Sequence, residues 1–222
     1  MRTCTLICLC LSFVCVPAWA GLSVGQQVSV QFKNVDPSTD VLIKTDESFL
    51  PAWTQAGTYN ILIDGLPYGS FCMDPQQRAK TSVLPYQVVE LWNAPVNDPL
   101  GYSKAQVLAN VLSQWSPGMT DTDRAGMQLA VWEVVAENSD TYNLQNGSFQ
   151  AYSWWGNGAI SAGNNFLSSS SIGNISDYLA VGNGCFQDYV ICNPVAVPVP
   201  SALLLAGMGV FVAGRLRKKP LL

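Results

Sequence analysis

The chain has 222 residues, with 11 Lys and Arg against 15 Asp and Glu, and it contains no histidine. Without histidine, Ser/His and Cys/His nucleophile schemes are excluded, and so is the commonest zinc ligand. We expect no metal and no cofactor. A hydrolase is the least favoured interpretation, because nothing in the spacing of the acidic residues singles out a carboxylate pair.

The first twenty residues are typical of an export signal. Arg2 provides a positive start, the apolar run Leu6 to Val16 is too short to span a bilayer comfortably, and "PAWA" places small residues before a cleavage point after Ala20. The alternative is a lipoprotein modified at Cys15, although Val14 is bulkier than the usual preceding residue. Four of the seven cysteines leave with this segment.

Residues 21–194 are predicted to form one exported domain. The segment carries six Lys or Arg and all fifteen Asp and Glu, a net charge of about −9, so nucleic acid is not expected as a partner. A domain of this length buries about 70% of the surface of its unfolded chain, so it needs no metal ion or set of disulfides to fold. We expect an α+β fold, a small antiparallel β-sheet or barrel packed with two or three helices.

Alternating apolar and polar residues predict strands in the first half of this domain. The strands are expected at 27–33, 58–64, 69–74 and 86–92. Turn-forming residues separate them. The turns are expected at 36–40, 64–69 and 95–101.

Two helices should follow. Ser103 with Gln106 has the pattern of a capping box for the first helix. Thr120 with Asp123 has the same pattern for the second helix, which should run to about Glu137. Beyond it the sequence favours loop, with at most one short helix near 162–167, and then strand within 177–191.

Gln128 occupies an unexpected position in the second helix. Helical spacing places it on one face with Val131, Trp132 and Val135, so the side chain should point inward. Burying an unpartnered amide costs about 1–3 kcal/mol. The simplest explanation is a hydrogen bond to a neighbouring backbone group, as most buried amides make.

Cys72 presents a complementary problem, because an odd number of cysteines, three, remains after signal removal. Cys185 and Cys192 flank a strand and could bridge across a hairpin, which leaves Cys72 alone. Its sulfur could attack the Gln128 side-chain carbonyl, release ammonia and leave an intramolecular thioester. The alternatives are a disulfide from Cys72 to Cys185 or Cys192, or an inert buried thiol.

The residues around both positions resemble the Cys-Gln thioester domains of bacterial surface adhesins and their relatives among exosortase substrates. The cysteine motif, an aromatic residue, Cys, an aliphatic residue and Asp, is matched by Phe71, Cys72, Met73 and Asp74. The glutamine motif, Gln-x-Ala-aliphatic-Trp, is matched by Gln128, Leu129, Ala130, Val131 and Trp132. The chain departs from the adhesins in Met127, where Thr is usual, and in a shorter Cys-to-Gln separation.

The resemblance implies a stored electrophile that forms covalent bonds to amines on a surface or matrix protein. Proximity would supply most of the activation. Without histidine to activate hydroxyls, amines should be preferred over sugar alcohols. Trp132 would shield the thioester from water. Asp74 would either polarise the amide or simply cap a turn.

Two further classes of function remain open. Phe149, Tyr152, Trp154 and Trp155 lie in a Gly- and Asn-rich segment and could stack on an exopolysaccharide, or their rings could close over the core. A passive matrix protein with no chemistry would have full sequence mass.

The C-terminal residues 195–222 are typical of a membrane stop. An apolar run from Ala202 to Ala213, short for a span, precedes a basic cluster that should stay cytoplasmic. The cluster consists of Arg215, Arg217, Lys218 and Lys219. An ordinary anchor that is never processed is one interpretation.

The same tail resembles the PEP-CTERM sorting signal in its "VPxP" variant. The motif is matched by Val197 to Ser201, which include Pro198 and Pro200. Val199 stands in place of Glu. The resemblance implies a Gram-negative bacterium with an exopolysaccharide system. It also implies recognition by an exosortase and transient anchoring in the inner membrane. The protein would reach the cell surface or the extracellular matrix.

Overall fold

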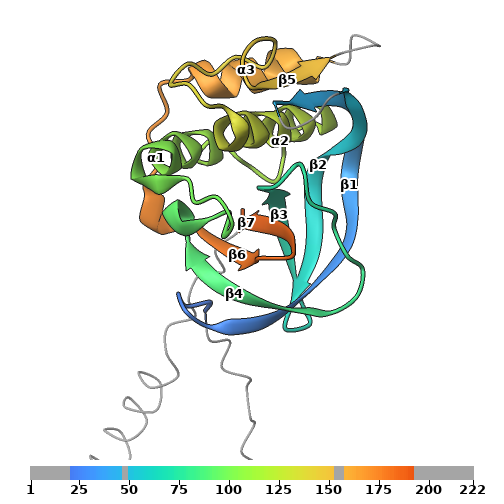
Figure 1. The fold of residues 1–222 in the computed structure, drawn as a ribbon, viewed down its shortest axis with the longest axis vertical. Helices are drawn as coiled ribbons and strands as arrows, with labels where there is room; N and C mark the ends of the chain where they lie inside the picture. Colours follow the sequence, from blue (N-terminus) through green and yellow to red (C-terminus); the bar gives the residue numbers. More distant parts are fainter. Residues whose placement is uncertain (1–20, 47–49, 153–157, 193–222) are drawn as a thin grey trace, which may run out of the picture. The chain divides into compact units, whose positions relative to one another are not determined.

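The computed structural model describes residues 21–46, 50–152 and 158–192. The alternating segments form an antiparallel sheet, and three helices lie beside it (Figure 1). The strands are β1 Gln27–Thr45, β2 Ala52–Ile63, β3 Leu66–Cys72, β4 Leu84–Glu90, β5 Phe149–Tyr152, β6 Leu179–Asn183 and β7 Phe186–Ile191. The helices are α1 Gly101–Leu112, α2 Asp121–Ala136 and α3 Ala159–Ser168, with single 3-10 turns at Leu91–Asn93 and Ile175–Asp177. The predicted α+β class is confirmed.

The predicted signal peptide and the predicted sorting tail both lie outside the described residues. Among the residues that are described, no helix is long and apolar enough to cross a membrane. The described part from Leu22 onward forms one compact unit.

Six of the strands close into a ring. The strand order is β2-β3-β7-β6-β4-β1-β5, and β1 also pairs with β2. The 19-residue β1 makes this closure, since Val30 is opposite Ile63 of β2 and also opposite Leu84 of β4. The far end of β1 pairs with β5, which lies outside the ring.

The turn predicted at 36–40 is wrong, because β1 continues through it and stays paired with β2. Pro37 lies in a register shift between Val35 and Ser38, where the missing proline N–H removes no ladder hydrogen bond. On β2, Gly57 leaves room for this irregularity, since a Cβ there would clash with the Pro37 carbonyl oxygen. The extended conformation therefore depends on a glycine twenty residues away.

Helix α2 begins as its sequence predicts. The Thr120 hydroxyl accepts a hydrogen bond from the Asp123 N–H at 3.1 Å. The cap predicted at Ser103 is wrong, because α1 already begins at Gly101 and its N-cap residue makes no side-chain hydrogen bond. The Gln106 amide instead donates to the Gly173 carbonyl at 2.7 Å.

Helix α2 lies between α3 and the closed sheet (Figure 1). It approaches α3 closely at Gly126, where a Cβ would come within 2.7 Å of the Ala162 Cβ. Beyond α2, β5 was not predicted, and α3 is longer than the expected segment 162–167.

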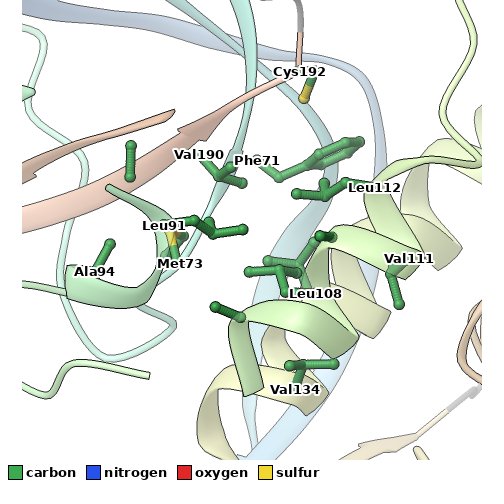
Figure 2. Close-up of a cluster of buried hydrophobic side chains, with 14 of the residues drawn as sticks. Phe71, Met73, Leu91, Ala94, Leu108, Val111, Leu112, Val134, Val190 and Cys192 are labelled. Carbon is green, nitrogen blue, oxygen red and sulfur yellow. The ribbon is translucent and has the colours of Figure 1, made fainter. Parts of the chain in front are cut away.

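One face of β3 and β7 packs against α1 and α2 and forms an apolar core (Figure 2). The core contains residues of both motifs, namely Phe71 and Met73 of the cysteine motif and Ala130 of the glutamine motif. It also contains Val190 of β7 and Cys192, which follows β7. Because side chains alternate along a strand, Cys72 points to the opposite face. That alternation separates the two buried cysteines.

Candidate functional site

The Gln128 side chain points inward from α2, as its helical position predicts, and hydrogen-bonds the main chain of Cys72. Its Oε1 accepts from the Cys72 N–H at 2.9 Å, and its Nε2 donates to the Cys72 carbonyl at 2.9 Å. Both residues are completely buried. The carboxamide therefore lies alongside the residue that carries the sulfur, with both of its polar atoms satisfied.

The sheet leaves room for this contact at the end of β3. The β2–β3 ladder ends at the pair Tyr59–Ser70, whereas the β3–β7 ladder continues to the pair Cys72–Tyr189. At Cys72 the amide of Gln128 therefore takes a place beside β3 that a neighbouring strand occupies elsewhere. A position 56 residues later in the chain supplies the missing partner.

The Cys72 sulfur has polar surroundings. Its thiol donates to the Asp74 carbonyl at 3.2 Å and accepts from the Asp74 N–H at 3.3 Å. Burial raises the pKa of this thiol strongly, and the nearby Trp132 indole opposes that effect. The thiol is therefore neutral in the folded domain at ordinary pH.

The Asp74 carboxylate caps a turn. Its Oδ1 accepts from the N–H groups of Gln76 at 3.0 Å and Gln77 at 3.1 Å. Of the two roles expected for Asp74, the described geometry supports the turn cap.

Three tyrosines gather on the inner face of the closed sheet near Cys72. Tyr189 is the register partner of Cys72, and its ring lies 6.0 Å from the ring of Tyr59 and 6.3 Å from that of Tyr86. The Tyr59 hydroxyl donates to the Gln55 carbonyl. Sequence reasoning missed this cluster, although the alternation in the strand ending at Ile191 would place Tyr189 on one face with Gln187.

The described cysteines are all free, and the predicted Cys185–Cys192 bridge is not formed. The whole of β7 separates the two, so their Cα atoms lie roughly 20 Å apart at the usual rise of a strand, far beyond disulfide reach. Cys72 and Cys192 point to opposite faces of the sheet. The fold thus gives Cys72 no cysteine partner.

The aromatic residues proposed for sugar binding separate into different environments. Phe149 is completely buried, and its ring lies 6.4 Å from that of Trp132. Tyr152 is 39% exposed. Trp154 and Trp155 lie outside the described residues.

Two acidic side chains, Glu133 in α2 and the C-cap residue Glu137, accept hydrogen bonds from the segment that follows the helix. The buried Glu133 accepts from the Asn143 N–H at 2.6 Å through Oε1, and its Oε2 has no hydrogen-bond partner in the described part. Glu137 accepts from the N–H groups of Ser139 and Ser148. Burial raises the pKa of Glu133 to about 7, with the Asn143 hydrogen bond opposing and Glu137 adding to the shift.

Comparisons with family models, with curated proteins and with solved structures gave no match. In the described residues, no group of three or more Cys, Asp or Glu side chains is arranged to hold a metal ion.

Proposed function

We propose that this is an exported surface or biofilm-matrix protein whose domain carries an internal Cys72–Gln128 thioester for covalent attachment to amines. One observation carries the proposal: the buried carboxamide of Gln128 is held by two hydrogen bonds against the main chain of a buried cysteine that has no cysteine partner. A buried amide bonded to backbone is also what an ordinary core glutamine would make. The thioester proposal therefore requires a chemical test.

The hydrogen bonds favour the reaction in a specific way. The Cys72 N–H donates to the carbonyl oxygen that would gain negative charge, as an oxyanion-hole donor does. The Cys72 sulfur bonds to the Gln128 carbonyl carbon, the bond from that carbon to Nε2 breaks, and the thiol proton leaves with the nitrogen as ammonia. The later attack by an amine forms an amide, breaks the carbon–sulfur bond and returns a proton to the sulfur.

Burial determines how such a bond would behave. Cys72 and Gln128 are completely buried, and Trp132 is 1% exposed, so bulk water has no direct access to the thioester. Hydrolysis of the stored bond would be slow, and a protein amine would reach the bond only after local opening. Without histidine in the chain, amines are favoured over sugar hydroxyls as partners.

The export and sorting parts of the proposal rest on the sequence of the two ends. Residues 1–20 would direct export, and residues 195–222, with the Pro198 and Pro200 motif and the basic cluster, would present the chain to an exosortase at the inner membrane. The product would be held at the surface or in the matrix.

The test is the intact mass of the purified exported domain. It should lie below the sequence mass by one ammonia, and incubation with methylamine should add one methylamine. Cys72→Ala should have its full sequence mass, whereas Cys192→Ala should keep the deficit. A deficit that persists in Cys72→Ala would contradict the proposal.

One observation favours a second candidate, non-covalent binding of exopolysaccharide. Trp53 is 58% exposed and Tyr152 is 39% exposed, and both are register partners of Leu42 on β1. The two rings thus share one face of the sheet, where they could stack on a sugar chain. Replacing Trp53 and Tyr152 with Ala should abolish retention on the bacterium's own polysaccharide, and unchanged retention would exclude this face.

A further inference from the structure

Two buried hydrogen-bond donors on the Cys72 side of β3 and β7 complete no hydrogen bond of normal geometry among the described residues, although one of them, the Trp132 indole, already lowers the pKa of the Cys72 thiol. They are the indole N–H of Trp132 and the hydroxyl of Tyr189, and each side chain is only 1% exposed. Leaving a buried donor unpaired disfavours the folded state. A charged acceptor on this side of the sheet would give both donors a partner.

The fold directs both side chains toward Cys72 from different elements. Trp132 follows Gln128 by one turn on the same face of α2. Tyr189 is directly opposite Cys72 on β7, so both side chains stand on the inner face of the sheet. The Trp132 indole therefore lies beside the thiol from the helix, and Tyr189 occupies the neighbouring position on the sheet.

The other hydroxyls of the tyrosine cluster are already used. Tyr86 donates to the Gln187 carbonyl at 3.0 Å, and Tyr59 donates to the Gln55 carbonyl at 3.2 Å. Only Tyr189 in this cluster has a hydroxyl without a partner. Tyr86 is therefore a matched control in the same environment.

We propose that Trp132 and Tyr189 donate hydrogen bonds to the Cys72 sulfur when it carries negative charge, both as the thioester forms and as an amine opens it. This inference rests on the proposed thioester. In the opening step the amine nitrogen bonds to the Gln128 carbonyl carbon, and the electron pair of the breaking carbon–sulfur bond goes to the sulfur. A proton from the amine then completes the thiol.

The need for such donors follows from burial. A thiolate in a site closed to water is strongly disfavoured, which is why burial raises the pKa of Cys72. Hydrogen bonds to a charged group are about twice as strong as those between neutral groups, so the two donors act mainly when charge develops. They would lower the barrier while barely affecting the resting thioester.

The experiment compares Tyr189→Phe, Trp132→Phe and the control Tyr86→Phe in the exported domain. Intact mass gives the thioester content, and its change with time gives the rates of opening by methylamine and of hydrolysis without amine. Tyr189→Phe and Trp132→Phe should each slow both reactions about five- to tenfold, the effect of one hydrogen bond. Tyr86→Phe should react like the unchanged domain.

The direction of the effect separates this role from simple shielding. If the two side chains only exclude water, their replacement should accelerate hydrolysis. Unchanged or faster reactions in Tyr189→Phe, with the mass deficit present in the unchanged domain, would overturn this inference and leave the thioester intact. Absence of the deficit in the unchanged domain would overturn the proposed function itself. Tyr189→Phe removes a single unpaired oxygen, so it should fold even if Trp132→Phe does not.

Discussion

Cys72 and Cys192 are both buried near the ends of neighbouring strands, yet they lie in opposite chemical environments. Cys192 faces the helices, among apolar side chains such as Phe71 and Val190 (Figure 2). Cys72 faces the interior of the closed sheet, where it lies beside the Gln128 carboxamide, the Asp74 main chain and the aromatic side chains of Trp132 and Tyr189. Burial is therefore shared by the two cysteines, whereas their polar surroundings are not.

The largest expected effect is the loss of the cross-link that we propose between Cys72 and Gln128. A bond closing a 56-residue loop stabilises the folded state by about 4 kcal/mol through chain entropy. Opening the thioester with methylamine should lower the free energy of unfolding in urea by that amount. Cys192→Ala should show the same drop, and a protein indifferent to methylamine would remove the distinction between the two cysteines.

The next effect concerns the amide that makes the Cys72 environment polar. With the cross-link removed by Cys72→Ala, adding Gln128→Leu leaves the buried N–H and carbonyl of residue 72 without partners. The free energy of unfolding should fall by about a further 2–6 kcal/mol, about 1–3 for each group. The exposed Gln145→Leu should cost far less in the same background. Equal costs would mean that these two hydrogen bonds contribute nothing.

The free energy of unfolding should depend on pH through Glu133 rather than through either cysteine. Burial raises the pKa of both thiols, so they stay protonated. The Glu133 pKa is raised from its ordinary 4.5 to about 7, so the folded state binds this proton more tightly than the unfolded state. The free energy of unfolding should therefore fall between pH 5 and pH 8, by up to about 3 kcal/mol.

Urea unfolding at both pH values checks this prediction. Glu133→Gln should remove most of the decline, whereas the exposed Asp98→Asn should not. Asp188, whose pKa burial raises to about 6, contributes a decline of the same sign at the lower end of the range. A full decline in Glu133→Gln would show that another group is responsible.

The smallest expected effect tests the polarity of the two surroundings directly. At position 192 a serine hydroxyl would be buried among apolar groups, so Cys192→Ser should be about 1 kcal/mol less stable than Cys192→Ala. At position 72 the hydroxyl can donate to the Asp74 carbonyl, so Cys72→Ser should be at least as stable as Cys72→Ala. The reverse order at either position would contradict the comparison.

Local patterns predicted most of the elements. Alternation located the strands near 27–33 and 58–64, and the Thr120 cap located the start of α2. The predictions are wrong where a residue distant in the sequence determines the local conformation. The segment 36–40 stays extended because it pairs with β2 opposite Gly57, and the four-residue β5 forms because the end of β1 offers an edge.

At the candidate site, too, local patterns predicted some features and distant contacts determined others. Helical period predicted that Gln128 points inward, and an odd cysteine count drew attention to Cys72. Neither pattern predicted that the amide bonds the main chain of Cys72, because that contact requires β3 and α2 to meet across 56 residues. The Cys185–Cys192 prediction failed because six strand residues keep two nearby positions apart.

By itself, the sequence determined that the domain is acidic and lacks histidine, and which face of α2 points inward. It also determined that Cys72 points to the opposite side of its strand from Phe71 and Met73. Composition and side-chain periodicity are local properties, so they can be taken from the sequence alone. Only the tertiary structure decided which groups surround each sulfur. Pairing of β3 with β7 placed Tyr189 opposite Cys72, and the packing of α2 brought Gln128 and Trp132 to the same residue. The physical reason is that burial and hydrogen-bond partners depend on contacts between distant segments, which no local pattern specifies.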